Sequence, residues 1–142
     1  MAKKPQIRAI AICIFRQGDR ILVNHGYNHT KQAHFCRPLG GGIDFGETSE
    51  AAVIREIREE LGVEMTAPKL LGVLESIYVY NDKPGHELVF VYDGQFVDSA
   101  LYDQISLQAV EGEQPFEARW RSLDELKSGD PLLVPEGLWT LL

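Results

Sequence analysis

Three glutamates, Glu56, Glu59 and Glu60, stand three and four residues apart in a stretch with helical periodicity. Side chains at these spacings meet on one face of a helix, so the three carboxylates share an edge. Neighbouring carboxylates repel one another, and their oxygens are the ligands that Mg²⁺ and Mn²⁺ accept. The pattern predicts a divalent-cation site; the alternative is a solvated helix face in which Arg55 and Arg58 dilute the repulsion.

The helix that must carry these carboxylates is expected over residues 48–61. Thr48 or Ser49 can cap its start, and Gly62 can adopt the left-handed conformation that ends it. At about 100° per residue, four apolar side chains fall on one face that should be buried: Val53, Ile54, Ile57 and Leu61. The run Gly40-Gly41-Gly42 precedes the helix and permits close approach of the backbone to a metal or ligand.

The stretch from Gly41 to Val63 resembles the signature of the Nudix hydrolase superfamily, GX5EX7REUXEEXGU, in which U is apolar. Every fixed position of that signature is matched in residues 41–63. The resemblance implies an α+β fold, the Nudix-type α/β/α sandwich with a mixed β-sheet and a loop–helix catalytic motif. One position beside the signature departs from many family members, because Leu39 stands where they carry proline and Pro38 comes one residue earlier.

The resemblance also implies a reaction, namely cleavage of a nucleoside diphosphate linked to another moiety, with Mg²⁺ or Mn²⁺. Such substrates include nucleoside triphosphates, dinucleoside polyphosphates and nucleotide conjugates. By this resemblance, Glu56, Glu59 and Glu60 bind the metal together with the backbone carbonyl of Gly40. Arg55 braces the carboxylates, and Glu47 makes a contact at the start of the helix.

A base for the attacking water is the least determined role, because it varies within the family. Glu59 is the first choice inside the signature. The distal alternatives are Glu111, Glu113 and Glu117, with Glu113 preferred because it lies in a polar loop. For each distal residue, a solvated acidic loop is the competing interpretation.

Candidate substrate contacts are spread over other parts of the chain. Arg37 can contact phosphate, and Tyr78 and Tyr80 lie 15 and 17 residues beyond Val63, near a position where a tyrosine accompanies dinucleoside polyphosphate substrates in part of the family. Further aromatic side chains could stack on a base or belong to the core: Tyr27, Phe35 and Trp120. Three histidines could form a zinc site, but loop histidines without metal are the preferred interpretation: His25, His29 and His34.

Strands are expected on both sides of the helix. A hairpin is predicted from residues 7–15 and 20–24, followed by a loop over 25–34 and a short strand over 35–39. A second hairpin is predicted from 69–80 and 86–97, then a strand over 117–121 and short helices over 123–127 and 136–142. Residues 1–142 therefore form one α+β domain.

Composition narrows the class of protein. The chain has 142 residues and a formal net charge of −7, which argues against general nucleic-acid binding and against anionic membranes. Only Cys13 and Cys36 are present, which indicates a reducing, cytoplasmic setting. We expect a monomer or homodimer acting on a small nucleotide. The alternative functions are a non-catalytic nucleotide-sensing domain and a structural domain.

Overall fold

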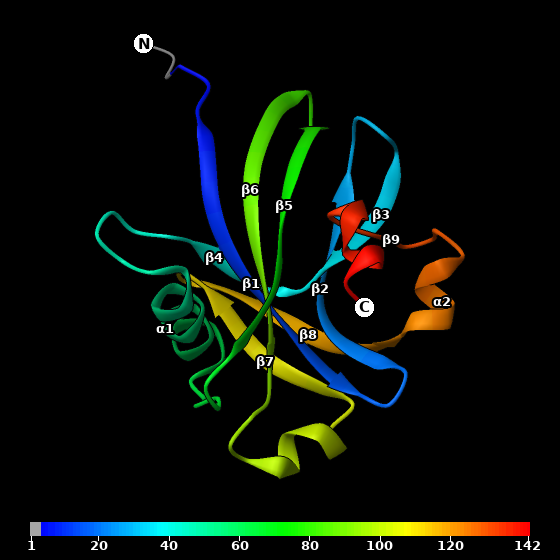
Figure 1. Cartoon of the computed structure of the whole chain (residues 1–142). Helices are drawn as coiled ribbons and strands as arrows, with labels where there is room; N and C mark the ends of the chain where they lie inside the picture. Colours follow the sequence, from blue (N-terminus) through cyan, green and yellow to red (C-terminus); the bar gives the residue numbers. More distant parts are fainter. Residues whose placement is uncertain (1–3) are drawn as a thin grey trace.

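The computed structural model (Figure 1) describes residues 4–142. The first three residues of the predicted single domain lie outside this range. In chain order the elements are β1 (Ile7–Gln17), β2 (Arg20–Asn28), β3 (Ala33–Arg37), β4 (Leu39–Gly42), α1 (Ser49–Leu61), β5 (Lys69–Tyr80), β6 (Lys83–Gly94), the 3₁₀ helix η1 (Ser99–Asp103), β7 (Ser106–Glu111), β8 (Gln114–Ser122), α2 (Leu123–Lys127), β9 (Leu132–Leu133) and the 3₁₀ helix η2 (Glu136–Thr140).

Strand β1 joins the two main groups of strands. Its first part pairs in parallel with β6 and antiparallel with β4, and β5 pairs with the far side of β6. Its last two residues pair with β2, which continues to β8 and β7. The sheet is therefore mixed, and helix α1 lies on the opposite side of the strands from α2 and the C-terminal segment (Figure 1).

Helix α1 begins and ends where the sequence predicts. The Thr48 hydroxyl accepts a hydrogen bond from the Ala51 N–H at 3.1 Å, and Gly62 ends the helix at φ 68°. Val53 and Ile57 are fully buried against the strands, while Ile54 and Leu61 are partly buried. Because the apolar face is fixed in this way, the glutamates of the helix must lie at its edge.

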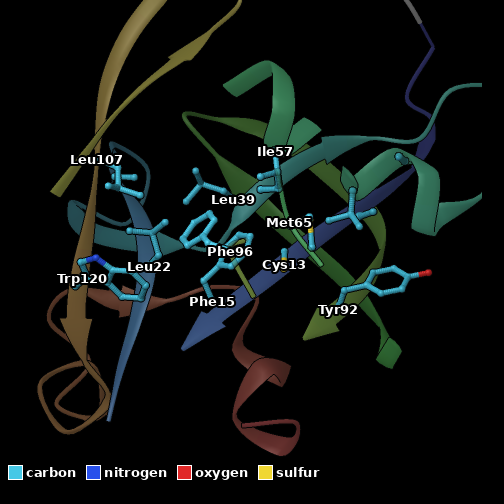
Figure 2. Packing of buried hydrophobic residues seen from close by; sticks show 14 residues of the cluster. Cys13, Phe15, Leu22, Leu39, Ile57, Met65, Tyr92, Phe96, Leu107 and Trp120 are labelled. Atoms are coloured by element: carbon cyan, nitrogen blue, oxygen red, sulfur yellow. The ribbon is translucent and has the colours of Figure 1, made fainter. Parts of the chain in front are cut away.

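Two apolar clusters lie on the two faces of β1, because successive strand residues point to opposite sides. Cys13 and Phe15 belong to the cluster beneath α1, in which Phe15, Leu22, Leu39 and Ile57 point toward one another (Figure 2). Residues of α2 and the C-terminal segment cover the other face with the even-numbered residues of β1. Burial raises the pKa of both thiols, Cys13 and Cys36.

Four features of the structure differ from what the sequence predicts. The loop predicted over residues 25–34 is wrong, because β2 runs on to Asn28 and forms a hairpin with β3. The second hairpin turns more tightly than predicted, through Asn81 and Asp82, which both take positive φ. Strand β7 is unpredicted; it is paired along its whole length with β8. Residues 136–140 form a 3₁₀ helix.

No helix within residues 4–142 has the length and apolar character needed to cross a membrane.

Gly40 should tolerate no side chain. Its φ of 151° suits glycine, and a Cβ there would overlap the Ala11 carbonyl oxygen and lie 2.7 Å from the Ile12 Cα. We expect Gly40→Ala to lower the free energy of unfolding by about 3 kcal/mol in urea denaturation. Gly18→Ala is the matched control, because its φ is +60° but nothing lies within 4 Å; it should cost only about 1 kcal/mol. Equal losses in the two variants would show that the overlap with β1 is relieved by movement of β4.

Candidate active site

Strand β4 passes directly beneath the acidic edge of α1. A Cβ built on Gly41 would lie 2.5 Å from the carboxyl carbon of Glu56, so a larger residue there would displace that carboxylate from its present position. Strand β4 is held in place by antiparallel pairing with β1, in which Gly40 is opposite Ile12 and Gly41 is opposite Ala11. The glycine run that was expected to allow close approach of the backbone is thus a strand, and it lies against the helix.

Arg55 connects this strand, the loop that follows it and the helix. Its guanidinium donates to both oxygens of Glu47, at 2.8 and 2.9 Å, and to the carbonyl of Gly42 at 2.9 Å. It also donates to Glu56 at 3.0 Å and to Glu59 at 3.2 Å. These hydrogen bonds raise the pKa of Arg55, and the bond from Arg55 lowers the pKa of Glu47 to about 2. The bracing role predicted for Arg55 therefore has a geometric basis.

Glu60 is the most buried carboxylate of the helix. It is only 9% exposed, and its Oε1 is fully buried with no hydrogen-bond partner among residues 4–142. Burial raises its pKa to about 8, reinforced by the negative charges of Glu56 and Glu111 and opposed by Arg37 and by a backbone hydrogen bond from Gly40. Burial also raises the pKa of Glu56. An orphaned acceptor in a field of other carboxylates is suited to a cation.

The carboxylates are neighbours along the helix edge, but they are not gathered into a closed set. Within residues 4–142, no three acidic, histidine or cysteine side chains are already arranged to hold a metal ion. Arg55 accounts for part of this arrangement, because it draws Glu56 and Glu59 toward its own guanidinium. The donor types nevertheless fit a hard cation, which prefers carboxylate and carbonyl oxygens.

A cavity of about 360 Å³ opens over this edge. Its walls include Gly40, Gly41 and Gly42 with the three helix glutamates, and they add charged side chains from four other strands: Arg8, Arg37, Glu87 and Glu111. Two guanidiniums and several carboxylates therefore face one small space. Such a space can accommodate phosphate groups together with cations.

A larger cleft of about 920 Å³ lies alongside, between the β5–β6 hairpin and the β2–β3 hairpin. Arg37, Glu87 and Glu111 line both spaces, so the two are contiguous. The cleft is lined by the predicted tyrosines Tyr78 and Tyr80. It is also lined by Phe35, whose ring meets that of Tyr80 edge-on at 5.7 Å between centroids. The structure thus brings the predicted substrate contacts to one cleft beside the acidic helix.

The other candidates from the sequence lie in different surroundings. Glu113 is exposed in the β7–β8 turn and does not line either cavity. Glu111, which was the less preferred candidate for the base, lines both cavities. Trp120 is only 7% exposed and packs against Tyr102 in the core. Two of the three candidate histidines, His25 and His34, lie in β2 and β3, line the larger cleft and stack at 5.2 Å between ring centroids.

Two polar cavity residues, Arg8 and Asn24, were not considered from the sequence. Glu87 was considered only as a residue at the start of a strand that could face the cleft, with a cross-strand pair or solvent exposure preferred. Arg8 lies two residues before the buried core of β1, and Glu87 lies two before that of β6. A charged residue placed in phase with a buried strand face was the available signal, since alternation directs it to the same side as the core.

The raised pKa of Glu60 predicts how stability depends on pH. The folded protein holds a proton that the unfolded chain releases near its ordinary pKa of 4.5, so the stability from Glu60 is complete below that pH and lost toward pH 8. In chelator, the free energy of unfolding should fall less steeply between about pH 5 and 8 in Glu60→Gln than in wild type. Urea denaturation across this range measures the two slopes. Equal slopes would contradict a protonated, buried Glu60.

Comparisons with known sequences bear on this geometry. The sequence model of the NUDIX domain family matches residues 5–137. The ADP-ribose pyrophosphatase of Methanocaldococcus jannaschii is 32% identical over 113 residues, which are 80% of this chain and 60% of that protein. The NAD-capped RNA hydrolase NudC of Salmonella paratyphi C is 29% identical over 133 residues, 94% of this chain and 44% of the relative. The chain therefore spans less than two thirds of either relative.

Solved structures share the fold. A NUDIX hydrolase from Nitrosomonas europaea superposes with a TM-score of 0.65 at 18% identity, covering 96% of this chain and 86% of its own. A MutT NUDIX hydrolase from Burkholderia pseudomallei gives a TM-score of 0.59 at 26% identity, covering 84% and 85%. Since the family match runs from before β1 into η2 and includes the glycine strand and the acidic helix, the chain belongs to the Nudix hydrolase family.

Proposed function

We propose that this protein is a divalent-metal-dependent pyrophosphohydrolase that cleaves a nucleoside diphosphate linked to another moiety. One observation carries the proposal: Glu60 is buried with an unpartnered oxygen in a polar cavity that opens into a cleft large enough for the rest of a nucleotide. The named relatives favour this substrate class, because ADP-ribose and the NAD cap each contain an ADP unit joined to a second group.

Glu56, Glu59 and Glu60 would hold Mg²⁺ or Mn²⁺, with the carbonyl of Gly40 as a further oxygen donor. When bound, the metal neutralises the diphosphate and makes a coordinated water more acidic. Glu60 would release its proton on cation binding, because the ligand form of a carboxylate is the ionised one. Arg55 would keep Glu56 in place, while Glu59 would exchange its hydrogen bond to the guanidinium for a bond to the metal.

The remaining roles belong to residues that line the two cavities. Arg8 and Arg37 would contact phosphate oxygens in the smaller cavity. Glu59 or Glu111 would accept the proton of the attacking water, since a base must lie within hydrogen-bond reach of it. Tyr78 and Tyr80 would flank the moiety that occupies the cleft.

A panel of substrates tests the proposal. ADP-ribose, NADH, ATP, a diadenosine polyphosphate and an NAD-capped RNA would each be incubated with Mg²⁺, and the products separated by chromatography. We expect a nucleoside monophosphate from at least one small substrate. Binding of these nucleotides without any hydrolysis, in either Mg²⁺ or Mn²⁺, would instead favour the alternative, a nucleotide-sensing domain. The intact set of acidic residues favours catalysis over sensing.

A further inference from the structure

Glu87 is a buried acid that the proposed chemistry does not use. It is 8% exposed, and it is the only charged residue besides Glu60 that is buried within residues 4–142. Among these residues no ion pair includes it. A buried carboxylate without a cation lowers the stability of the fold, so the presence of Glu87 points to a role in function.

The direction of the Arg8 side chain explains why Glu87 has no ion-pair partner among the described residues. Arg8 of β1 lies beside Glu87 of β6, and both point to the same face of the sheet. The guanidinium of Arg8, however, extends toward β4, where one nitrogen would lie 3.3 Å from a Cβ built on Gly42. The cation that could have paired with Glu87 therefore faces the smaller cavity instead.

Tyr78 is the neighbour that Glu87 retains. Its side chain lies near the Glu87 carboxylate, and burial together with that neighbouring carboxylate raises the pKa of Tyr78. The hydroxyl end of the Tyr78 ring lies against Gly85, where a Cβ would fall 2.6 Å from the phenolic oxygen. Glycine at position 85 thus lets β6 hold the tyrosine close to the carboxylate.

Glu87 and Tyr78 lie where the two cavities meet. Glu87 lines both cavities, whereas Arg8 lines only the smaller one and Tyr78 only the larger. Glu87 therefore stands at the junction, where a substrate passes from its phosphates to the group they carry. An ionised carboxylate only accepts hydrogen bonds, so it attracts hydroxyl groups and repels a further phosphate.

We propose that Glu87, positioned by Tyr78, determines specificity by accepting hydrogen bonds from the hydroxyl groups of a sugar attached to the diphosphate. The inference rests on the proposed function for the location of the diphosphate. It deepens that function by selecting nucleoside diphosphate sugars over substrates that continue with more phosphate. Glu87 acts on recognition, and the metal-binding carboxylates act on the phosphates.

Equilibrium binding tests the inference without turnover. Titration calorimetry with Mg²⁺ present would compare ADP-ribose with ADP, each as its methylene-bridged analogue that cannot be hydrolysed, for wild type, Glu87→Gln and Tyr78→Phe. Wild type should bind ADP-ribose more tightly than ADP, and Glu87→Gln should reduce that preference by about tenfold or more, because hydrogen bonds to charged groups are strong. Tyr78→Phe keeps the ring against Gly85, so it should shift the preference in the same direction by about threefold.

Asp93→Asn is the matched control. Asp93 lies on the same strand and the same face as Glu87, is exposed and does not line either cavity, so its variant should bind as wild type does. Equal loss for both ligands in Glu87→Gln, or no preference for ADP-ribose in wild type, would overturn the inference. If Glu87→Gln fails to fold, an unchanged preference for ADP-ribose in Tyr78→Phe would overturn the inference.

The two proposals fail separately. Sugar preference that depends on Glu87 in a protein that hydrolyses no substrate would refute the pyrophosphohydrolase and retain the recognition role. Hydrolysis of ADP-ribose with a preference over ATP that Glu87→Gln leaves unchanged would refute only the recognition role.

Discussion

Excess chelator should reduce hydrolysis of the best substrate to background, a loss on the order of 10³-fold or more, because metal ions contribute several kcal/mol to such reactions. Without a cation, Arg8 and Arg37 alone among the described residues that line the smaller cavity would offset the charge of a polyanionic substrate beside the acidic helix edge, in a protein whose formal net charge is already −7. Added Mg²⁺ or Mn²⁺ should restore the rate. Initial rates before and after readdition measure both effects.

Thermal unfolding provides the control for this experiment. The chelated protein should remain folded, and millimolar Mg²⁺ should raise its melting temperature because cation binding to the folded state removes repulsion among the carboxylates. Full turnover in excess chelator would rule out the metal-dependent reaction. A rate that is not recovered after cations are returned would point to denaturation instead.

Glu59→Gln should lower turnover by about 10²-fold or more, since a positioned base contributes about 10²- to 10⁴-fold. The Glu59 side chain is 60% exposed, so its replacement by glutamine should leave the helix intact. Circular dichroism and urea denaturation should therefore match wild type. Glu50→Gln in the first turn of the same helix is the control, because Glu50 does not line either cavity. Its turnover should change little.

Two further variants locate the base. Glu111 lines both cavities, so Glu111→Gln should also lower turnover, whereas Glu113→Gln should not if the exposed turn residue stays outside the reaction. Collapse of the rate in Glu113→Gln alone would return the base to the residue preferred from sequence. Turnover near wild type in all three glutamine variants, with folding intact, would refute the site assignment.

The acidic helix was predictable because everything that forms it is local. Thr48, Gly62 and the apolar residues at helical spacing act within a few residues of one another, and the structure confirms their roles. The glycine run before it was harder to interpret. Gly40 needs its conformation because Ala11 of β1 lies against it, and no local pattern carries that contact.

The cavities depend on contacts between distant strands, which one sequence does not encode visibly. Glu87 meets Tyr78 and lies beside Arg8 only through the pairing of β5, β6 and β1. The positions of Glu111 and Glu113 depend on where the β7–β8 turn begins. A difference of two residues decides which of the two carboxylates remains on the strand and which lies in the turn. The polar residues 25–34 concealed a hairpin, since its exposed face carries histidines and a tyrosine where apolar alternation would be expected.

The larger cleft is built from chain segments separate from the one that carries the acidic helix. Its lining comes from Ile10 and Ile12 of β1, from residues 24–37, 74–87 and 132–137, and from Glu111, while the metal-binding candidates all fall within residues 40–60. Substitutions in those outer segments can alter which molecule fits without disturbing the helix, its caps or Arg55. Selection could therefore redirect such a scaffold toward new metabolites in small steps, each of which retains the bond-breaking machinery. The same separation gives a protein engineer a defined set of positions to randomise and a defined set to leave untouched.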